Sequence, residues 1–321
     1  MGANKIRKLK IMKTFLVTGG SGFIGSAIAN YLANIGAKVV VFDNNSRGKL
    51  YRIKNKKIIF IKGDIRNKRD LAKAFYKYKY NTVIHLAYIN GTKFFYKKPA
   101  EILEVAIKGL VNILDLCVEK NIRNLFLASS SEVYQYPNKF PTPENIPLVV
   151  PDIKNPRFSY GGGKILTELM GYHYGKKFFK KLVIFRPHNV YGHDMGNEHV
   201  IPEFIERIKS KTNIFKIKGT GNETRSFIYI TDFVKAFDII LRKGKHCEIY
   251  NIGTEEEINI KTLAKKIAKI YKKKIFIKKM SLAKGGTQRR CPDISKIKKL
   301  GFVQKISLEN GIKLILSQNK R

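Results

Sequence analysis

The chain has 321 residues, of which 44% are hydrophobic, and its 63 Lys and Arg against 24 Asp and Glu give a formal net charge of +39. This length suits a protein with a large core, and no apolar run approaches the ~18 residues of a membrane span, so we expect no membrane association. The three cysteines lie far apart, which excludes a disulfide framework and favours reduced thiols in a cytoplasmic protein.

The positive charge raises the question of a nucleic-acid partner. The lysines are spread along the whole chain in short clusters, such as Lys54–Lys57, and no aromatic-basic recognition motif accompanies them. We interpret them as a solvated surface that attracts anionic substrates, and we expect no nucleic-acid partner. Residues 1–12 are predicted to be a basic tail, without the apolar core of a secretory signal. The histidines lack carboxylates at ligand-like spacing, so no metal site is predicted.

A strand, a glycine-rich turn and a helix are predicted from residue 13 onward. An apolar run at 15–17 ends in a polar residue, Gly19, Gly22 and Gly25 follow, and a helical pattern begins at Phe23. Gly19 permits a tight turn, Gly22 lets the backbone approach a phosphate, and Gly25 lets the helix pack close to the strand. Because a helix N-terminus presents unpaired N–H groups to a pyrophosphate, we predict a dinucleotide site here.

Asp43 ends the second predicted strand, 38–43, about 20 residues after the glycine turn, where dinucleotide-binding folds carry an acidic residue. Its carboxylate can accept hydrogen bonds from the adenosine ribose and would repel a 2′-phosphate, which favours NAD over NADP. Arg47 and Lys49 follow closely and keep NADP open.

Strands and helices continue to alternate through the first half of the chain. We predict strands at 58–61, 82–87, 124–128 and 182–185, and helices at 69–78, at 99–119 and from about residue 158. This alternation predicts an α/β fold with a doubly wound parallel (Rossmann) sheet. In such sheets ligands bind at the carboxyl ends of the strands, where Asp43, Asp64, Ala87 and residues 129–131 fall.

A proline-rich connection, residues 136–156, leads to a predicted helix that contains Tyr160 and Lys164. Residues four apart share one helical face. A nearby ammonium lowers the pKa of a phenol, so Tyr160 can act as an acid or base near neutrality. With a serine at the end of the preceding strand, the pair forms a candidate catalytic set.

The second half of the chain is predicted to be a smaller C-terminal α/β lobe that closes over the sheet edge. Its expected elements are a helix after Pro202, a helix at 231–242, a strand at 248–252 and helices at 260–271 and 307–317. We therefore divide the chain into a dinucleotide-binding domain, 13–187, and a substrate-binding lobe, 188–321. The two share a core and are not cleanly separable.

An ordered set of motifs spans nearly all of residues 13–315. They are TGGSGFIG at 18–25, GDI at 63–65, HLA at 85–87, SSSEVY at 129–134, the Tyr160–Lys164 pair, RPHNVYG at 186–192, RSF at 225–227, YNIG at 250–253 and RCPDI at 290–294. The set resembles the extended short-chain dehydrogenase/reductases, specifically the NAD-dependent nucleotide-sugar epimerase/dehydratase family. The resemblance implies an NAD-dependent enzyme acting on a nucleotide-activated sugar, and a homodimer that pairs two helices, here 99–119 and 158–179.

The resemblance also implies a role for each matching residue. NAD is expected to contact Gly19, Gly22, Phe23, Ile24, Gly25, Asp43, Asp64, Ile65, Leu86, Ala87, Ser129, Tyr160, Lys164 and Pro187. The catalytic set is Ser130, Glu132, Tyr160 and Lys164, and the substrate is expected to contact Ser130, Asn189, Arg225 and Arg290. Guanidinium groups pair with phosphate through two hydrogen bonds, which suits the two arginines to a diphosphate.

In the mechanism that the resemblance implies, Tyr160 takes the proton of the sugar 4-hydroxyl while hydride passes from C4 to NAD, and Ser130 hydrogen-bonds the developing 4-keto oxygen. The fate of the 4-keto sugar stays open. A 4-epimerase is slightly favoured because epimerases are frequent in the family. Glu132 keeps a 4,6-dehydratase or an NDP-uronate decarboxylase open, since some of these enzymes use such a Glu near C5 and C6, although it would equally fit a residue that caps the following segment.

A non-catalytic, NAD-bound RNA-binding or scaffold protein is the rival of a different class, and the intact set of Ser130, Tyr160 and Lys164 argues against it. Some residues depart from the family pattern. Tyr88 replaces the usual small residue after HLA, Ala106 stands where many members have a cofactor-facing Asn, Gln135 replaces the usual Gly, and glycines fill positions 161–163.

Overall fold

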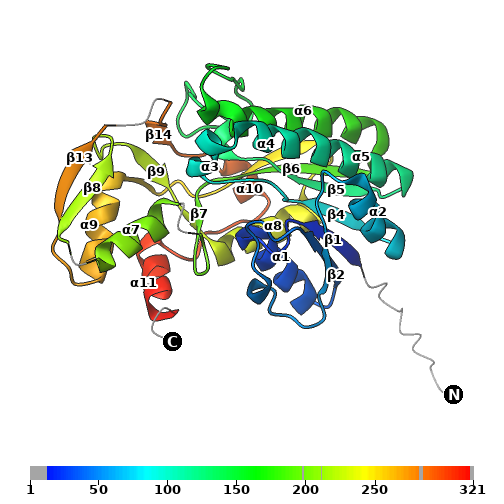
Figure 1. Ribbon diagram of the computed structural model, residues 1–321, viewed down its shortest axis with the longest axis horizontal. Coiled ribbons are helices and arrows are strands. Elements are labelled where there is room, and N and C mark those ends of the chain that lie inside the picture. The colour runs from blue at the N-terminus through cyan, green and yellow to red at the C-terminus, as the bar shows by residue number, and fades with distance from the viewer. Residues whose placement is uncertain (1–12, 197–198, 211, 282–284, 319–321) are drawn as a thin grey trace.

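A seven-stranded parallel sheet forms the centre of the molecule in the computed structural model, which describes residues 13–196, 199–210, 212–281 and 285–318 (Figure 1). The strand order is β11 (Glu248–Ile252), β6 (Lys181–Pro187), β5 (Asn124–Ala128), β4 (Thr82–His85), β1 (Thr14–Thr18), β2 (Lys38–Asp43) and β3 (Ile59–Lys62). Every neighbouring pair is parallel, which confirms the predicted doubly wound sheet. The predicted basic tail, 1–12, lies outside the described residues.

Helices cover both faces of the sheet because both faces are apolar. Along β1, Phe15 and Val17 join the core beneath α1 (Phe23–Asn34) and α8 (Ile230–Lys243). Leu16 points the other way, into the core beneath α2 (Lys68–Lys77), α5 (Leu110–Glu119) and α6 (Ser159–Phe178). This alternation follows from the two-residue period of a strand. Because the strands run parallel, the loops at their carboxyl ends lie along one edge of the sheet.

The helix predicted at 99–119 is continuous but not regular. It runs as α4 (Pro99–Glu104), a π-helical turn at Val105–Gly109 and α5. A π turn inserts an extra residue and is frequent at functional sites. The preceding short helix α3 (Thr92–Lys97), which carries Phe94 and Phe95, was not predicted, because its six residues are too short to show a helical period.

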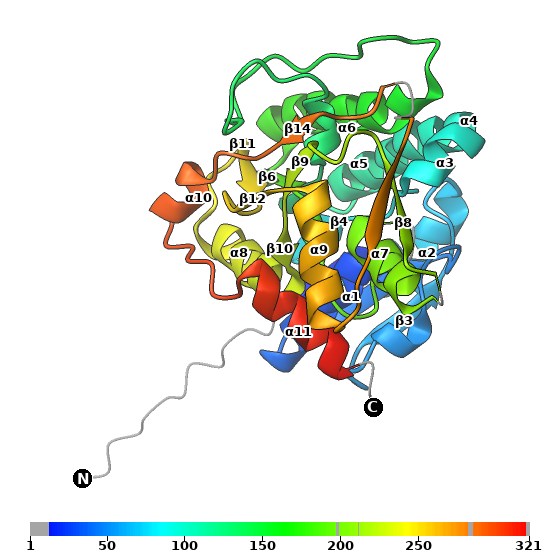
Figure 2. The ribbon, with the colours of Figure 1, turned by 90° about the vertical axis from the view of Figure 1, so that its left-hand side faces the viewer.

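The second half adds a smaller lobe, onto which Figure 2 looks. Its helices are α7 (Val200–Lys209), α9 (Ile260–Ile270), α10 (Ser295–Lys299) and α11 (Leu308–Gln318). Small sheets join β7 (Val190–Tyr191) to β10 (Ile228–Tyr229), β8 (Ile214–Lys218) to β13 (Phe276–Met280), and β9 (Thr224–Ser226) to both β12 (Glu257–Asn259) and β14 (Arg289–Arg290). The helix expected after Pro202 begins earlier, at Val200, since proline is tolerated in the first turn, where its missing N–H would be unpaired anyway.

Residues on both sides of the predicted boundary at 187 share one core. Strand β11 pairs with β6 in the main sheet, and α8 packs against α1. The division into two domains therefore stays a prediction, while the shared core is a feature of the structure. No helix within the described ranges is long and apolar enough to cross a membrane.

Candidate active site

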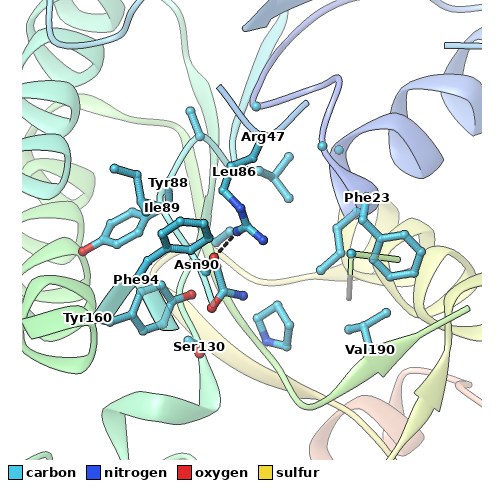
Figure 3. Close-up of a pocket in the computed structure, with 18 of the residues that line it drawn as sticks. Phe23, Arg47, Leu86, Tyr88, Ile89, Asn90, Phe94, Ser130, Tyr160 and Val190 are labelled. Carbon is cyan, nitrogen blue, oxygen red and sulfur yellow. Dashed lines mark hydrogen bonds between the residues drawn. The ribbon is translucent and has the colours of Figure 1, made fainter. Parts of the chain in front are cut away.

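A cavity of about 620 Å³ lies at the carboxyl ends of the strands, between the sheet and the C-terminal lobe (Figure 3). Every residue that the sequence predicted for cofactor, substrate or catalysis lines it. In Figure 3, Tyr88, Phe94 and Tyr160 lie on one side of the cavity and Phe23 and Val190 on the other. The structure thus brings the predicted site residues together around one cavity, and their roles stay predictions.

The glycine turn between β1 and α1 forms the floor of the cavity. Gly19 has a φ of +70°, which favours glycine, and its N–H donates to the Phe42 carbonyl at 2.9 Å. A Cβ on Gly25 would overlap the Gly19 carbonyl oxygen, so the helix can start this close to the strand only with glycine there. No side chain caps α1 and no acidic residue lies in its first turn. Its N–H groups and positive dipole end therefore suit a pyrophosphate.

Asp43 is held in place by backbone donors. Its Oδ2 accepts from the Ser21 N–H at 3.0 Å and its Oδ1 from the Asn45 N–H at 2.8 Å. Each oxygen keeps a lone pair with which to accept a ribose hydroxyl. The Arg47 guanidinium donates to the Asn90 carbonyl and lies 5.1 Å from the centre of the Phe94 ring (Figure 3). Arg47 is thus hydrogen-bonded on the β4 side of the cavity. The glycine turn, the first turn of α1 and Asp43 fit NAD.

The carboxylate of Asp64, which is predicted to contact the cofactor, accepts hydrogen bonds from Arg66 and Asn44. Arg66 donates to Oδ1 through Nε at 3.0 Å and to Oδ2 through Nη2 at 2.8 Å, and Asn44 donates to Oδ2 at 3.0 Å. The hydrogen bonds from Arg66 lower the pKa of Asp64 to about 2, against the opposing effect of burial. The carboxylate therefore stays ionised at the cavity wall.

The buried Lys164 lies one turn from Tyr160 on α6, and its Nζ donates to the Ala128 carbonyl at 2.7 Å. Burial lowers the pKa of Lys164 to about 7, while Glu168 opposes the shift. The Tyr160 ring is also buried and stacks on Phe95 with ring centres 4.7 Å apart. Ser130 hydrogen-bonds the Tyr160 side chain.

The lowered pKa that the sequence predicted for Tyr160 is wrong for this structure. Burial is the largest effect and raises the pKa of Tyr160, and the Ser130 hydrogen bond only partly offsets it. The Lys164 ammonium lies 5.9 Å from the centre of the Tyr160 ring, too far for direct contact with the ring face. Residue spacing placed the pair on one helical face but could not show how deeply both would be buried.

A buried ionic network beneath the site was missed by the sequence reasoning. Arg186 on β6 donates to both oxygens of Glu168, at 2.7 and 2.6 Å, and to the Tyr134 hydroxyl at 2.6 Å. Ser129 also donates to Glu168, so its hydroxyl is engaged beneath the site and not in the cavity. The available signal was a charged residue inside an apolar strand, which requires a buried partner.

Glu132 and Arg290, to which the sequence gave separate roles, contact one another. Arg290 Nη1 donates to Glu132 Oε1 at 2.7 Å, and Arg157 Nη2 donates to Oε2 at 2.8 Å. Burial raises the pKa of Glu132, but the two guanidinium groups outweigh it and hold the pKa at about 2. Arg157 was not predicted, since an arginine at the start of a helix gives no sign of a partner 25 residues earlier.

The same end of the cavity carries an excess of positive charge. Arg225 donates to the Thr224 and Thr287 carbonyls, both at 2.7 Å, and burial together with the nearby Arg290 lowers its pKa to about 10. Asn189, in the left-handed region with a φ of +40°, donates to the Ser226 carbonyl at 2.8 Å. Arg157, Arg225 and Arg290 gather around Glu132, and Glu223 also lies near Arg225. Among the described residues at this end, arginines thus outnumber carboxylates, so it suits an anionic group. Within the described ranges, no group of three acidic, His or Cys side chains could hold a metal ion.

Comparison with known proteins finds relatives along the whole chain. The model of the NAD dependent epimerase/dehydratase family matches residues 15–253. A putative UDP-glucose 4-epimerase of Methanocaldococcus jannaschii is 33% identical over 314 residues, which cover 95% of this chain and 98% of the relative. A dTDP-D-glucose 4,6-dehydratase of Dictyostelium discoideum is 34% identical over 273 residues, which cover 81% of this chain but only 62% of that protein.

Among solved structures, a UDP-glucose 4-epimerase of Thermotoga maritima with UDP-glucose superimposes with a TM-score of 0.87 at 28% identity. The superposition covers 96% of this chain and 100% of that one. This chain is therefore similar, at modest identity, to proteins of both reaction types, 4-epimerases and 4,6-dehydratases.

Proposed function

The chain belongs to the NAD-dependent epimerase/dehydratase family, and from this premise we propose that it is a nucleotide-sugar 4-epimerase that acts through a 4-keto sugar. NAD is the cofactor of the family. When bound, NAD would accept a hydride from C4 of the sugar and return it. The residues that would hold NAD are those of the glycine turn, the first turn of α1 and Asp43.

Proton handling falls to Tyr160 and Ser130, which are hydrogen-bonded to one another in the cavity. Tyr160 would take the proton of the sugar 4-hydroxyl and later return it, and Ser130 would hydrogen-bond the oxygen at C4. The Lys164 ammonium, held by the Ala128 carbonyl, would stabilise the negative charge that Tyr160 gains when it takes the proton, against the opposing effect of burial.

Substrate recognition is proposed for the positive end of the cavity. Arg225 and Arg290 would bind the substrate diphosphate, with Asn189 beside them, because one guanidinium group can donate two parallel hydrogen bonds to a phosphate. The excess of arginine over carboxylate there supports an anionic ligand, and nucleotide sugars carry two phosphates.

The observation that favours epimerisation over dehydration is the pairing of Glu132 with two arginines. A 4,6-dehydratase needs an acid or base near C5 and C6. The pKa of Glu132 is about 2, so near neutrality its carboxylate holds no proton to donate and is a weak base. A 4-epimerase needs neither role. The second candidate, a 4,6-dehydratase, is favoured by the 34% identity with the Dictyostelium enzyme, and it would require the substrate to draw Arg290 away from Glu132.

A panel of UDP-, GDP-, CDP- and dTDP-sugars, incubated with the purified protein, tests the proposal. We expect a product of unchanged mass with the opposite configuration at C4, identified by mass spectrometry and NMR. Loss of water or CO₂ would identify the dehydratase or the decarboxylase. If no sugar is converted and bound NAD is never reduced, the enzymatic proposal fails.

A homodimer in the cytoplasm completes the proposal. The continuous helix formed by α4, the π turn and α5 lies beside α6 on one face of the sheet (Figure 1), and Leu103, Ile107 and Leu169 are exposed on these elements. Exposed apolar side chains on neighbouring helices are typical of a face that pairs with a second copy. The three cysteines are free thiols, as a reducing compartment requires.

A further inference from the structure

We propose that Tyr88 is a positioning residue whose aromatic face holds the Lys164 ammonium beside Tyr160, and that residue 163 is a glycine because the Tyr88 hydroxyl occupies the space that a Cβ would need. The inference rests on the proposed function only in that Tyr160 and Lys164 are taken as the proton-handling pair. It assigns a purpose to residues that depart from the family pattern.

The ring of Tyr88 contacts both groups that it would position. Lys164 Nζ lies 3.8 Å from the centre of the Tyr88 ring, against 5.9 Å for the Tyr160 ring. The Tyr88 and Tyr160 rings meet edge to face, with centres 5.1 Å apart and planes at 82°. An ammonium this close to a ring face is attracted by the ring quadrupole, and the attraction strengthens where water is excluded. The Tyr88 face and the Ala128 carbonyl therefore fix the ammonium from two directions.

The hydroxyl of Tyr88 occupies a slot between two helices. A Cβ on Gly163 would overlap the Tyr88 hydroxyl oxygen and lie 2.9 Å from the Ala106 Cβ, which belongs to the π turn. A larger residue at position 163 would therefore displace the Tyr88 side chain, the Ala106 methyl group, or both. Within the described part of the chain this buried hydroxyl has no hydrogen-bond partner. Burying an unpaired hydroxyl is unfavourable. The hydroxyl therefore does not explain why a tyrosine stands here, whereas the contact of its ring face with Lys164 does.

Other charged or titratable groups near Lys164 do not replace this contact. Glu168 supports the ammonium from one turn along α6, but it is shared with Arg186 and Ser129. His85 on β4 stays neutral near pH 7, because burial and Lys164 lower its pKa to about 3. Tyr160 is a neutral phenol until it loses its proton. Since burial lowers the Lys164 pKa to about 7, Lys164 is only about half charged at neutral pH, and loss of the Tyr88 ring would reduce the charged fraction further.

The first test reads Lys164 directly and needs no sugar. In protein labelled with ¹³C at lysine Cε, the Lys164 signal is identified by its absence in Lys164→Arg and followed against pH in the NAD-bound protein. We expect Tyr88→Leu to lower the Lys164 pKa by about 0.5 to 1, as loss of a desolvated cation–π contact predicts, and Tyr88→Phe to keep the wild-type value. An unchanged pKa in Tyr88→Leu, or the same fall in Tyr88→Phe, would overturn the proposal. Because this titration uses no sugar, it tests the role of Tyr88 even if the protein does not catalyse the proposed reaction.

The second test uses the slot itself. Gly163→Ala should push its methyl group into the Tyr88 hydroxyl and lower the Lys164 pKa, although alanine favours a helix over glycine. In an Ala106→Gly background, which removes the second close contact of the new Cβ, at 2.9 Å, adding Tyr88→Phe removes the overlapping oxygen and should restore the wild-type value. Gly162→Ala is the matched control, because its Cβ would meet Val150 at an ordinary 3.4 Å. With a converted sugar, kcat should fall roughly 3- to 30-fold in Gly163→Ala with little change in KM. A harmless Gly163→Ala, or no rescue by Tyr88→Phe, would contradict the proposal.

Discussion

Glu132 is the residue on which the choice of reaction depends. Its carboxylate joins Arg157, in the short 3-10 helix (Pro156–Phe158) that precedes α6, to Arg290 in the C-terminal lobe, through bonds of 2.8 and 2.7 Å. A carboxylate that is fully used in this way orients two guanidinium groups for an anionic substrate and does little proton chemistry. Its role in the proposed mechanism is therefore to position arginines.

Substitution of Glu132 separates the reaction types. In an epimerase, Glu132→Gln should keep kcat within about tenfold of wild type and mainly raise KM, because the arginines lose their anchor but Tyr160 and Ser130 are untouched. Glu309→Gln, at an exposed ion pair with Lys313 on α11, is the control and should change neither constant. A fall in kcat of about a thousandfold, measured with saturating sugar, would show that Glu132 takes part in the chemistry.

The pH dependence of stability reports the same contact. The pKa of Glu132 is about 2 in the folded protein, below its ordinary value of 4.5. Its stabilising effect is therefore complete above about pH 4.5 and is lost as the pH falls toward 2. We expect the urea midpoint of wild type to fall more between about pH 6 and pH 3 than that of Glu132→Gln. Parallel curves for the two proteins would mean that the arginines do not lower this pKa.

At the scale of elements, the long periodic segments were predictable and the short ones were not. The strands of the main sheet and helices such as α1, α6 and α9 have enough residues to show an apolar period. Strand β14 has two residues, Arg289 and Arg290, and forms only because β9, more than 60 residues earlier, offers it an edge. That pairing also brings Arg290 to the cavity. The sequence therefore predicted Arg290 as a substrate residue but not the strand pairing that places it there.

The helical face formed by α4, α5 and α6 predicts the oligomeric state. Leu169 is 57% exposed on α6. Leu169→Glu should convert the dimer into a monomer, because a charge buried in an apolar interface is costly. The molar mass is measured by light scattering after size exclusion. Leu314→Glu, at a 38% exposed leucine on α11, is the control and should stay dimeric. A wild-type monomer, or an unaffected Leu169→Glu, would contradict this assignment of the interface.

At the scale of the whole molecule, the net charge of +39 acts on every anion that approaches. We expect RNA or DNA oligonucleotides to bind weakly at low salt, with affinity that falls steeply and is lost near about 150 mM salt. The measurement is a salt series of binding curves for wild type and Tyr160→Phe. Tight binding that survives physiological salt in both proteins would favour the nucleic-acid-binding rival.

The candidate site shows where sequence reasoning stops. Glycine spacing, the acidic residue at the end of β2 and the Tyr160–Lys164 spacing were sufficient to name residues that line one cavity. The partners of those residues were hidden, because Glu132 and Arg290 are 158 positions apart in the chain. Burial, which raises the pKa of Tyr160 and lowers that of Lys164, is a property of the packed molecule.

The central claim is that Tyr160 supports oxidation and re-reduction at C4 of a nucleotide sugar with no other bond broken. The most direct measurement is conversion of a sugar from the nucleotide panel in D₂O, by wild type and by Tyr160→Phe, followed by NMR and mass spectrometry. We expect wild type to give the C4 epimer at unchanged mass without deuterium on carbon, and Tyr160→Phe to bind NAD without turnover. Deuterium at C5, loss of water or CO₂, or full activity of Tyr160→Phe would contradict the account.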